Sequence, residues 1–112
     1  MQPYDLSVLE QLDDRQQVLQ ILDLFLVNAP LQVSDLLKEA ANKDWSKVYA
    51  HAHKLKGSVG IIQAYGLVDL LQQIEKQAKA TDVTESALIG VLEKFTTAFA
   101  ELETQLKEER NK

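Results

Sequence analysis

The stretch AHKLKGSVG, residues 52–60, lies in the middle of the chain. It contains one of the two histidines, His53, and two of the four glycines, Gly57 and Gly60. Helical patterns flank the stretch on both sides, so we expect it to lie within a helix. A glycine inside a helix costs about 1 kcal/mol relative to alanine. The two glycines therefore indicate that another molecule comes close to this backbone.

A helical wheel at about 100° per residue turns His53 away from the apolar stripe of its own helix. This stripe lies about 180° to 240° from His53 and contains Val48, Leu55, Val59 and Ile62. Gly57, Gly60 and Lys56 fall within about 60° of His53. We therefore expect His53 to be exposed, with open space and a positive charge beside it. His51 falls at the edge of the stripe, and we expect it to be structural.

The remainder of the chain is predicted to be helical as well. Apolar residues recur at the three- and four-residue spacing of an amphipathic helix in four segments, about 14–41, 45–62, 67–78 and 85–106. Short polar breaks separate them at 42–44, 63–66 and 81–84. The pattern predicts an all-α protein, an antiparallel four-helix bundle with a short additional N-terminal helix that carries Leu6, Leu9 and Leu12.

We expect residues 1–112 to form a single domain, with a bundle core at about 14–106 and a frayed charged tail at 107–112. Pro30 interrupts the first long pattern, which predicts either one helix kinked at the proline or two helices that meet there. Asp44 is a good N-cap for the helix that contains His53. Asp82 and Glu85 have the spacing of a capping box before the last helix.

Composition excludes several classes of protein. There is no cysteine, which rules out disulfides and cysteine-ligated zinc. The net charge of −5 disfavours a nucleic-acid partner. No apolar run approaches the roughly 18 residues of a membrane span, and the N-terminus lacks the pattern of a secretory signal. We therefore expect a cytoplasmic monomer that neither binds nucleic acid nor inserts into a membrane.

An exposed histidine beside a lysine suits phosphoryl chemistry. A neutral imidazole is nucleophilic near neutral pH, so His53 can accept a phosphoryl group covalently. Lys56 can neutralise phosphate oxygens, and Lys54 can reach the edge of the same site. His51 and His53 diverge on the helix, so they do not form a metal site, and no nucleotide-binding motif is present. These features favour a carrier that receives phosphate from one partner and passes it to another, without cofactor, metal or autokinase activity.

Residues 52–58, AHKLKGS, closely resemble the His-x-Leu-Lys-Gly-Ser signature of histidine-containing phosphotransfer (HPt) domains, which relay phosphate between receiver domains. The segments 25–30, 44–45 and 67–75 resemble further parts of that family. The resemblance implies that His53 is the phosphoacceptor and that Lys56 stabilises the phosphoryl group. It also implies that small residues at Gly57 and Gly60 admit the receiver. A polar side chain on the next helix, Glu75 or Gln72, would orient the imidazole.

The chain departs from the family pattern at Gln63, where many members carry a glycine, and this bears on the geometry of the helix junction. The resemblance implies receiver domains or a hybrid sensor kinase as partners, with Mg²⁺ held by the receiver. Met1 favours a free-standing protein, and an excised domain of a hybrid kinase is the alternative. The alternative function is a non-catalytic helical adaptor that binds a receiver without accepting phosphate.

Overall fold

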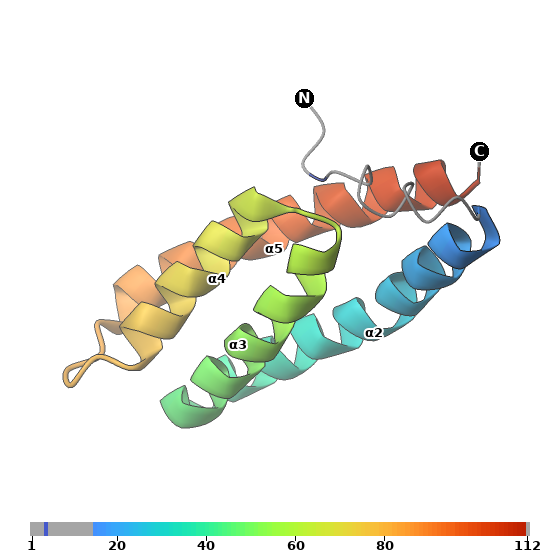
Figure 1. The fold of residues 1–112 in the computed structure, drawn as a ribbon. Coiled ribbons are helices and arrows are strands. Elements are labelled where there is room, and N and C mark those ends of the chain that lie inside the picture. The colour runs from blue at the N-terminus through green and yellow to red at the C-terminus, as the bar shows by residue number, and fades with distance from the viewer. Residues whose placement is uncertain (1–3, 5–14, 112) are drawn as a thin grey trace.

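The computed structural model describes residue 4 and residues 15–111, and four helices account for most of them. They are α2 (Arg15–Ala41), α3 (Trp45–Ile61), α4 (Tyr65–Ala78) and α5 (Glu85–Arg110). Each helix contacts two neighbours, in the order α2, α3, α4, α5 and back to α2 (Figure 1). Short turns reverse the chain between successive helices, so the prediction of an antiparallel four-helix bundle is confirmed. The predicted N-terminal helix with Leu6, Leu9 and Leu12 lies outside the described residues.

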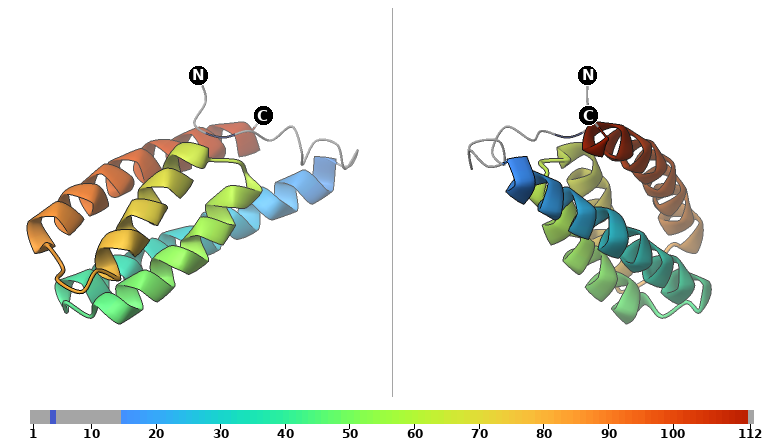
Figure 2. Two further views of the ribbon diagram at one scale, coloured as in Figure 1. Left: turned by 60° about the vertical axis from the view of Figure 1, so that its left-hand side comes forward. Right: turned by 90° about the vertical axis from the view of Figure 1, so that its right-hand side faces the viewer.

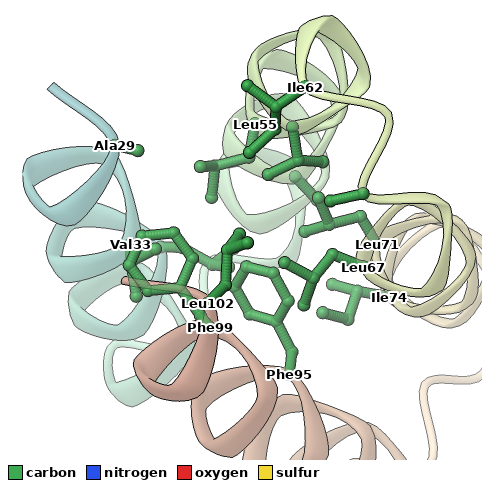
Figure 3. Packing of buried hydrophobic residues seen from close by; sticks show 14 of the residues in the cluster. Ala29, Val33, Leu55, Ile62, Leu67, Leu71, Ile74, Phe95, Phe99 and Leu102 are labelled. Carbon is green, nitrogen blue, oxygen red and sulfur yellow. The ribbon is translucent and has the colours of Figure 1, made fainter. Parts of the chain in front are cut away.

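Apolar stripes from all four helices meet in one core. Phe95 projects from α5 toward Leu67 and Ile74 of α4, and Phe99 lies on the side of α2, near Val33 (Figure 3). Phe99 also lies 6.2 Å, between ring centroids, from Phe25 of α2. On α3 the buried residues are Val48, Ala52, Leu55 and Val59. Because this stripe faces inward, the opposite face of α3 is left at the surface.

Helix α2 runs without interruption through Pro30. Phe25, Ala29 and Val33 are buried along one side of it, before and after the proline. Their packing keeps both halves of the helix on the same core, which offsets the missing backbone donor. The prediction of one continuous helix is therefore confirmed, and the alternative of two helices meeting at Pro30 is wrong. The kink at the proline stays a prediction.

The helix ends follow the sequence predictions in part. Asp44 caps α3 as predicted, because its carboxylate accepts a hydrogen bond from the backbone N–H of Lys47 at 3.3 Å. The predicted capping box before α5 is wrong, since the N-cap is Thr84 and Glu85 is already the first helical residue. Helix α5 continues to Arg110, beyond the expected onset of fraying, and Arg110 pairs with Asp23 of α2 at 2.7 Å.

Tyr4 adds a core residue from outside the helices that the sequence analysis did not identify. Its side chain is buried and belongs to the same apolar cluster. Burial raises the pKa of its phenol, and the negative charges of Glu109 and Glu108 raise that pKa further. Tyr4 therefore lies near the C-terminal end of α5, so a residue close to the start of the sequence packs beside its end.

Candidate functional site

Helix α3 lies between α2 and α4 (Figure 2). It presents His53 at the surface of the molecule. The His53 side chain is 66% exposed, whereas its neighbours Ala52 and Leu55 are fully buried. His51 is partly buried at the edge of the core. The wheel therefore predicted the orientation of both histidines correctly, because α3 is a regular helix with one buried stripe.

Glu75 connects α4 to the exposed face of α3. Its side chain is only 10% exposed, and its Oε2 lies 3.4 Å from Nδ1 of His53. Its other oxygen, Oε1, lies 2.9 Å from Nζ of Lys56. A buried carboxylate requires such partners, because leaving it unpaired in a poorly solvated place is costly. One carboxylate thus joins the histidine and the lysine that the sequence analysis selected.

The contact with Glu75 determines which imidazole nitrogen is free. An ionised carboxylate only accepts hydrogen bonds, so Nδ1 of His53 must carry the proton and donate it. The other ring nitrogen, Nε2, then holds the lone pair. Because the side chain is largely exposed, that lone pair is accessible to another molecule.

Two further side chains extend this group, since Tyr49 lies against the His53 ring and Lys79 lies against Tyr49. The ring of Tyr49 stacks on the imidazole, with 6.1 Å between centroids and 12° between the ring planes. Nζ of Lys79, the C-cap residue of α4, lies 5.3 Å from the centroid of Tyr49. Neither residue was predicted to belong to the site. The available signal was spacing, since Tyr49 precedes His53 by four residues and Lys79 follows Glu75 by four.

The flank of α3 toward α2 carries an apolar groove with a volume of about 680 Å³. Lys54 and Ser58 line it from α3, and the Ser58 hydroxyl donates to Oε1 of Gln32 on α2 at 3.2 Å. Three of the apolar side chains that line it are largely exposed, Leu24 at 61%, Leu31 at 62% and Ile61 at 56%. The structure therefore separates the two lysines beside His53, with Lys56 at Glu75 and Lys54 at the groove.

Both glycines of the central stretch leave open space at the surface of α3. A Cβ atom added at Gly57 or Gly60 would meet no other atom within 4 Å. Among the described residues, no neighbouring atom therefore requires glycine at either position.

Within residue 4 and residues 15–111, no group of three histidine, cysteine, aspartate or glutamate side chains is arranged to hold a metal ion. None of the helices in this described part of the chain is long and apolar enough to cross a membrane.

Comparison with known proteins identifies the family. The sequence model of the Hpt domain matches residues 20–111. The chain belongs to the Hpt domain family. Hpt domains are the phosphotransfer modules of two-component phosphorelays.

Curated relatives of this Hpt domain are much longer proteins. Over 95 residues it is 27% identical to the virulence sensor protein BvgS of Bordetella pertussis and to BvgS of Bordetella bronchiseptica. The match covers 85% of this chain but only 8% of each sensor protein. No solved structure gives a significant match.

The geometry distinguishes the two residues that were expected to orient the imidazole. Among the described residues, the carboxylate of Glu75 is hydrogen-bonded to His53, and the amide of Gln72 is not. Gln72 is exposed and lines a shallow depression beside Tyr49 and Glu75. The position of α4 against α3 makes this distinction, because the packing brings the carboxylate rather than the amide to the ring.

Proposed function

We propose that this Hpt domain relays a phosphoryl group between the aspartates of two receiver domains through phospho-His53. The observation that carries the proposal is the contact between Nδ1 of His53 and the buried carboxylate of Glu75. This contact leaves Nε2 as the nucleophile on an exposed surface. It also places a negative charge behind the ring, where positive charge develops when Nε2 is phosphorylated.

In the proposed transfer, each bond that forms at phosphorus replaces one that breaks. The Nε2 lone pair attacks the phosphorus of an aspartyl phosphate, the phosphorus–oxygen bond breaks, and aspartate leaves as a carboxylate. The Nδ1 proton stays in its hydrogen bond with Glu75, which stabilises the cationic phosphoimidazole. In onward transfer a second aspartate attacks phosphorus, the nitrogen–phosphorus bond breaks, and His53 returns neutral. The chain thus acts as a stoichiometric carrier and not as an enzyme with its own nucleotide site.

Lys56 supplies a positive charge that offsets the negative charge of the phosphoryl group on His53. Its ammonium pairs with Glu75 in the unphosphorylated structure. A phosphoryl group on Nε2 brings additional negative charge to the same face, so the ammonium moves toward the phosphoryl oxygens. Phosphoryl transfer depends mostly on such positioning and charge stabilisation.

The receiver docks on the face of α3 that joins His53 to the apolar groove. Gly57 and Ile61 follow His53 at intervals of four residues, so this face leads from the imidazole to the exposed edge of the groove. Gly57 gives the receiver close access to the backbone, while Leu24 and Leu31 offer apolar surface from α2. Leu6 and Leu9 of the expected N-terminal helix, which we propose as further contributors to this surface, lie outside the described residues.

The partners are receiver domains of response regulators, of a hybrid sensor kinase, or of both. We expect the receiver to hold the Mg²⁺ ion. The ion would there offset the negative charges of the receiver's aspartate and of the phosphoryl group that it carries. The chain acts as a cytoplasmic monomer, without nucleic acid.

The direct test is phosphoryl uptake from a phosphorylated receiver domain. Wild-type protein should gain a label that is labile in acid and stable in base, and His53→Gln should gain none. His51→Gln is the matched control, and it should be labelled like wild type because His51 faces the edge of the core. Equal labelling of wild type and His53→Gln would refute the proposal. Receiver binding that survives His53→Ala, with no phosphohistidine signal in ³¹P NMR, would favour the adaptor instead.

A further inference from the structure

Tyr49 and Lys79 form a contact pair beside the imidazole that the transfer mechanism does not use. We infer that this pair positions the His53 ring, so that Nε2 points at the incoming phosphorus. The inference rests on the proposed relay function. It assigns the pair no contact with the phosphoryl group, because the role is exerted through the imidazole.

The first observation is that the hydrogen bond to Glu75 restrains the ring weakly. At 3.4 Å it is longer than the usual range for a nitrogen–oxygen hydrogen bond. The side chain is also largely exposed, so little packing surrounds it. Rotation about the terminal torsion of histidine is broad. A ring held only through Nδ1 can therefore pivot and swing Nε2 out of line.

The second observation is the stack of Tyr49 on the imidazole. The ring planes differ by 12°, so the two rings are nearly parallel. Both residues lie on α3, four positions apart, where helical side chains meet. A nearly parallel ring limits rotation of the imidazole plane, which is the motion that the contact with Glu75 leaves free.

The third observation is that Lys79, at the C-cap of α4, contacts Tyr49. Its ammonium is 5.3 Å from the ring centroid, within the range of a cation–π interaction. Lys79 follows Glu75 by one helical turn, so α4 contacts both parts of the arrangement. Glu75, in the last turn of α4, thus contacts Nδ1, and Lys79, at the C-cap of α4, contacts the ring that stacks on the imidazole.

Positioning of this kind affects the rate of transfer more than binding of the partner. In-line attack requires the lone pair of Nε2 to point at phosphorus, and small displacements of a reacting group are costly. We expect Tyr49→Leu to slow phosphoryl uptake by about 10- to 100-fold, on the scale known for misplaced reacting groups. Tyr49→Phe keeps the ring and should restore most of the rate.

The experiment combines NMR of the His53 ring with single-turnover phosphotransfer. In wild type and Tyr49→Phe, ¹⁵N spectra should show one tautomer, protonated at Nδ1, with a restrained ring. Tyr49→Leu and Lys79→Met should show mixed tautomers or faster ring motion, and a lower transfer rate at unchanged receiver affinity. Tyr65→Leu and Lys76→Met are the matched controls, and both should retain the wild-type ring signals.

The ring signals separate this inference from the relay function itself. If wild type forms no phosphohistidine, the relay fails, yet the NMR comparison still tests the restraint. If Tyr49→Leu keeps the wild-type tautomer and ring motion, the positioning role is wrong even if transfer slows. An equal loss of rate in Tyr49→Phe would also overturn it, because the ring would then not be the active feature. Thermal unfolding of each variant checks that the fold is retained.

Discussion

At the scale of single residues, the site depends on a carboxylate that lies almost inside the protein. Among the residues that the structure describes, Glu75 is the one charged residue whose side chain is buried. It holds Lys56 with one oxygen and His53 with the other. This arrangement is energetically reasonable because both contacts are hydrogen-bonding or ionic and the site opens to water on the outer side.

Glu75→Gln should slow phosphorylation of His53. The amide oxygen can still accept from Nδ1, but the negative charge that stabilises the phosphorylated ring and holds Lys56 is lost. A hydrogen bond to a charged group contributes about 1.5–3 kcal/mol, so we expect a rate reduction of about tenfold or more. Single-turnover phosphotransfer from a phosphorylated receiver measures this effect.

Gln72→Ala is the control, because Gln72 is the other residue that the sequence suggested for orienting the imidazole. It should transfer phosphate at the wild-type rate. A larger loss in Gln72→Ala than in Glu75→Gln would contradict the role given to the carboxylate.

At the scale of helices, the ends of α2 and α3 contain the strained positions. Lys43 and Gln63 are the two non-glycine residues with positive φ among the described residues, at 57° and 55°. After α3, the N–H of Gln63 donates to the carbonyl of Gly60, and the N–H of Ala64 donates to that of Val59. These two bonds form a Schellman motif with Gln63 at the left-handed position, where glycine is usual.

Gln63→Gly should stabilise the protein. A left-handed backbone costs an L-residue about 1–2 kcal/mol, and glycine adopts it without that cost. The greater freedom of glycine in the unfolded chain offsets part of the gain, so we expect a net increase of about 0.5–1 kcal/mol. Thermal unfolding should show a rise in Tm of about 3–6 °C.

Gln63→Ala is the matched control for loss of the glutamine side chain, and it should give no comparable rise in Tm. Gln63→Gly should also transfer phosphate like wild type, since the junction shapes α3 and α4 without touching His53. A lower Tm for Gln63→Gly than for Gln63→Ala would contradict the assignment of strain to this position.

At the scale of the whole molecule, charge is divided unevenly between the two halves of the bundle. Residues 42–80, which contain α3 and α4, carry six lysines and three acidic residues. The rest of the chain carries six basic and fourteen acidic residues. The helices that hold His53 are therefore net positive in a chain whose net charge is −5.

This division should speed the approach of an anionic partner to the His53 side. The proposed donor presents an acyl phosphate, and opposite charge raises association rates at low ionic strength. We expect Lys76→Glu, on α4, to lower the association rate of a phosphorylated receiver about threefold or more at low ionic strength. Stopped-flow binding at low and high ionic strength measures the effect.

Lys94→Glu, on α5, makes the same charge change on the other half of the bundle and should affect association less. The difference between the two variants should shrink at high ionic strength, where surface charges are screened. Equal slowing by both variants would mean that net charge, and not its distribution, controls the encounter.

Much of the fold was predictable because its signals are local. The four amphipathic patterns, the cap at Asp44 and the outward direction of His53 depend on residues within one or two helical turns of each other. The wrong prediction of a capping box also came from a local signal. Asp82 and Glu85 have the spacing of such a box, but α5 begins at Glu85 itself. Tyr4 carried no local signal, because its burial depends on the distant end of α5.

By itself the sequence determined the helical class, the family signature at residues 52–58 and the histidine that faces outward, since helical periodicity sets the direction of each side chain. Only the tertiary structure decided that Glu75, and not Gln72, reaches the imidazole. Only the tertiary structure brought Lys79 to Tyr49 and opened the groove between α2 and α3. The physical reason is that these contacts depend on how far α3 and α4 slide and rotate against each other. The packing of buried side chains across the bundle sets that arrangement.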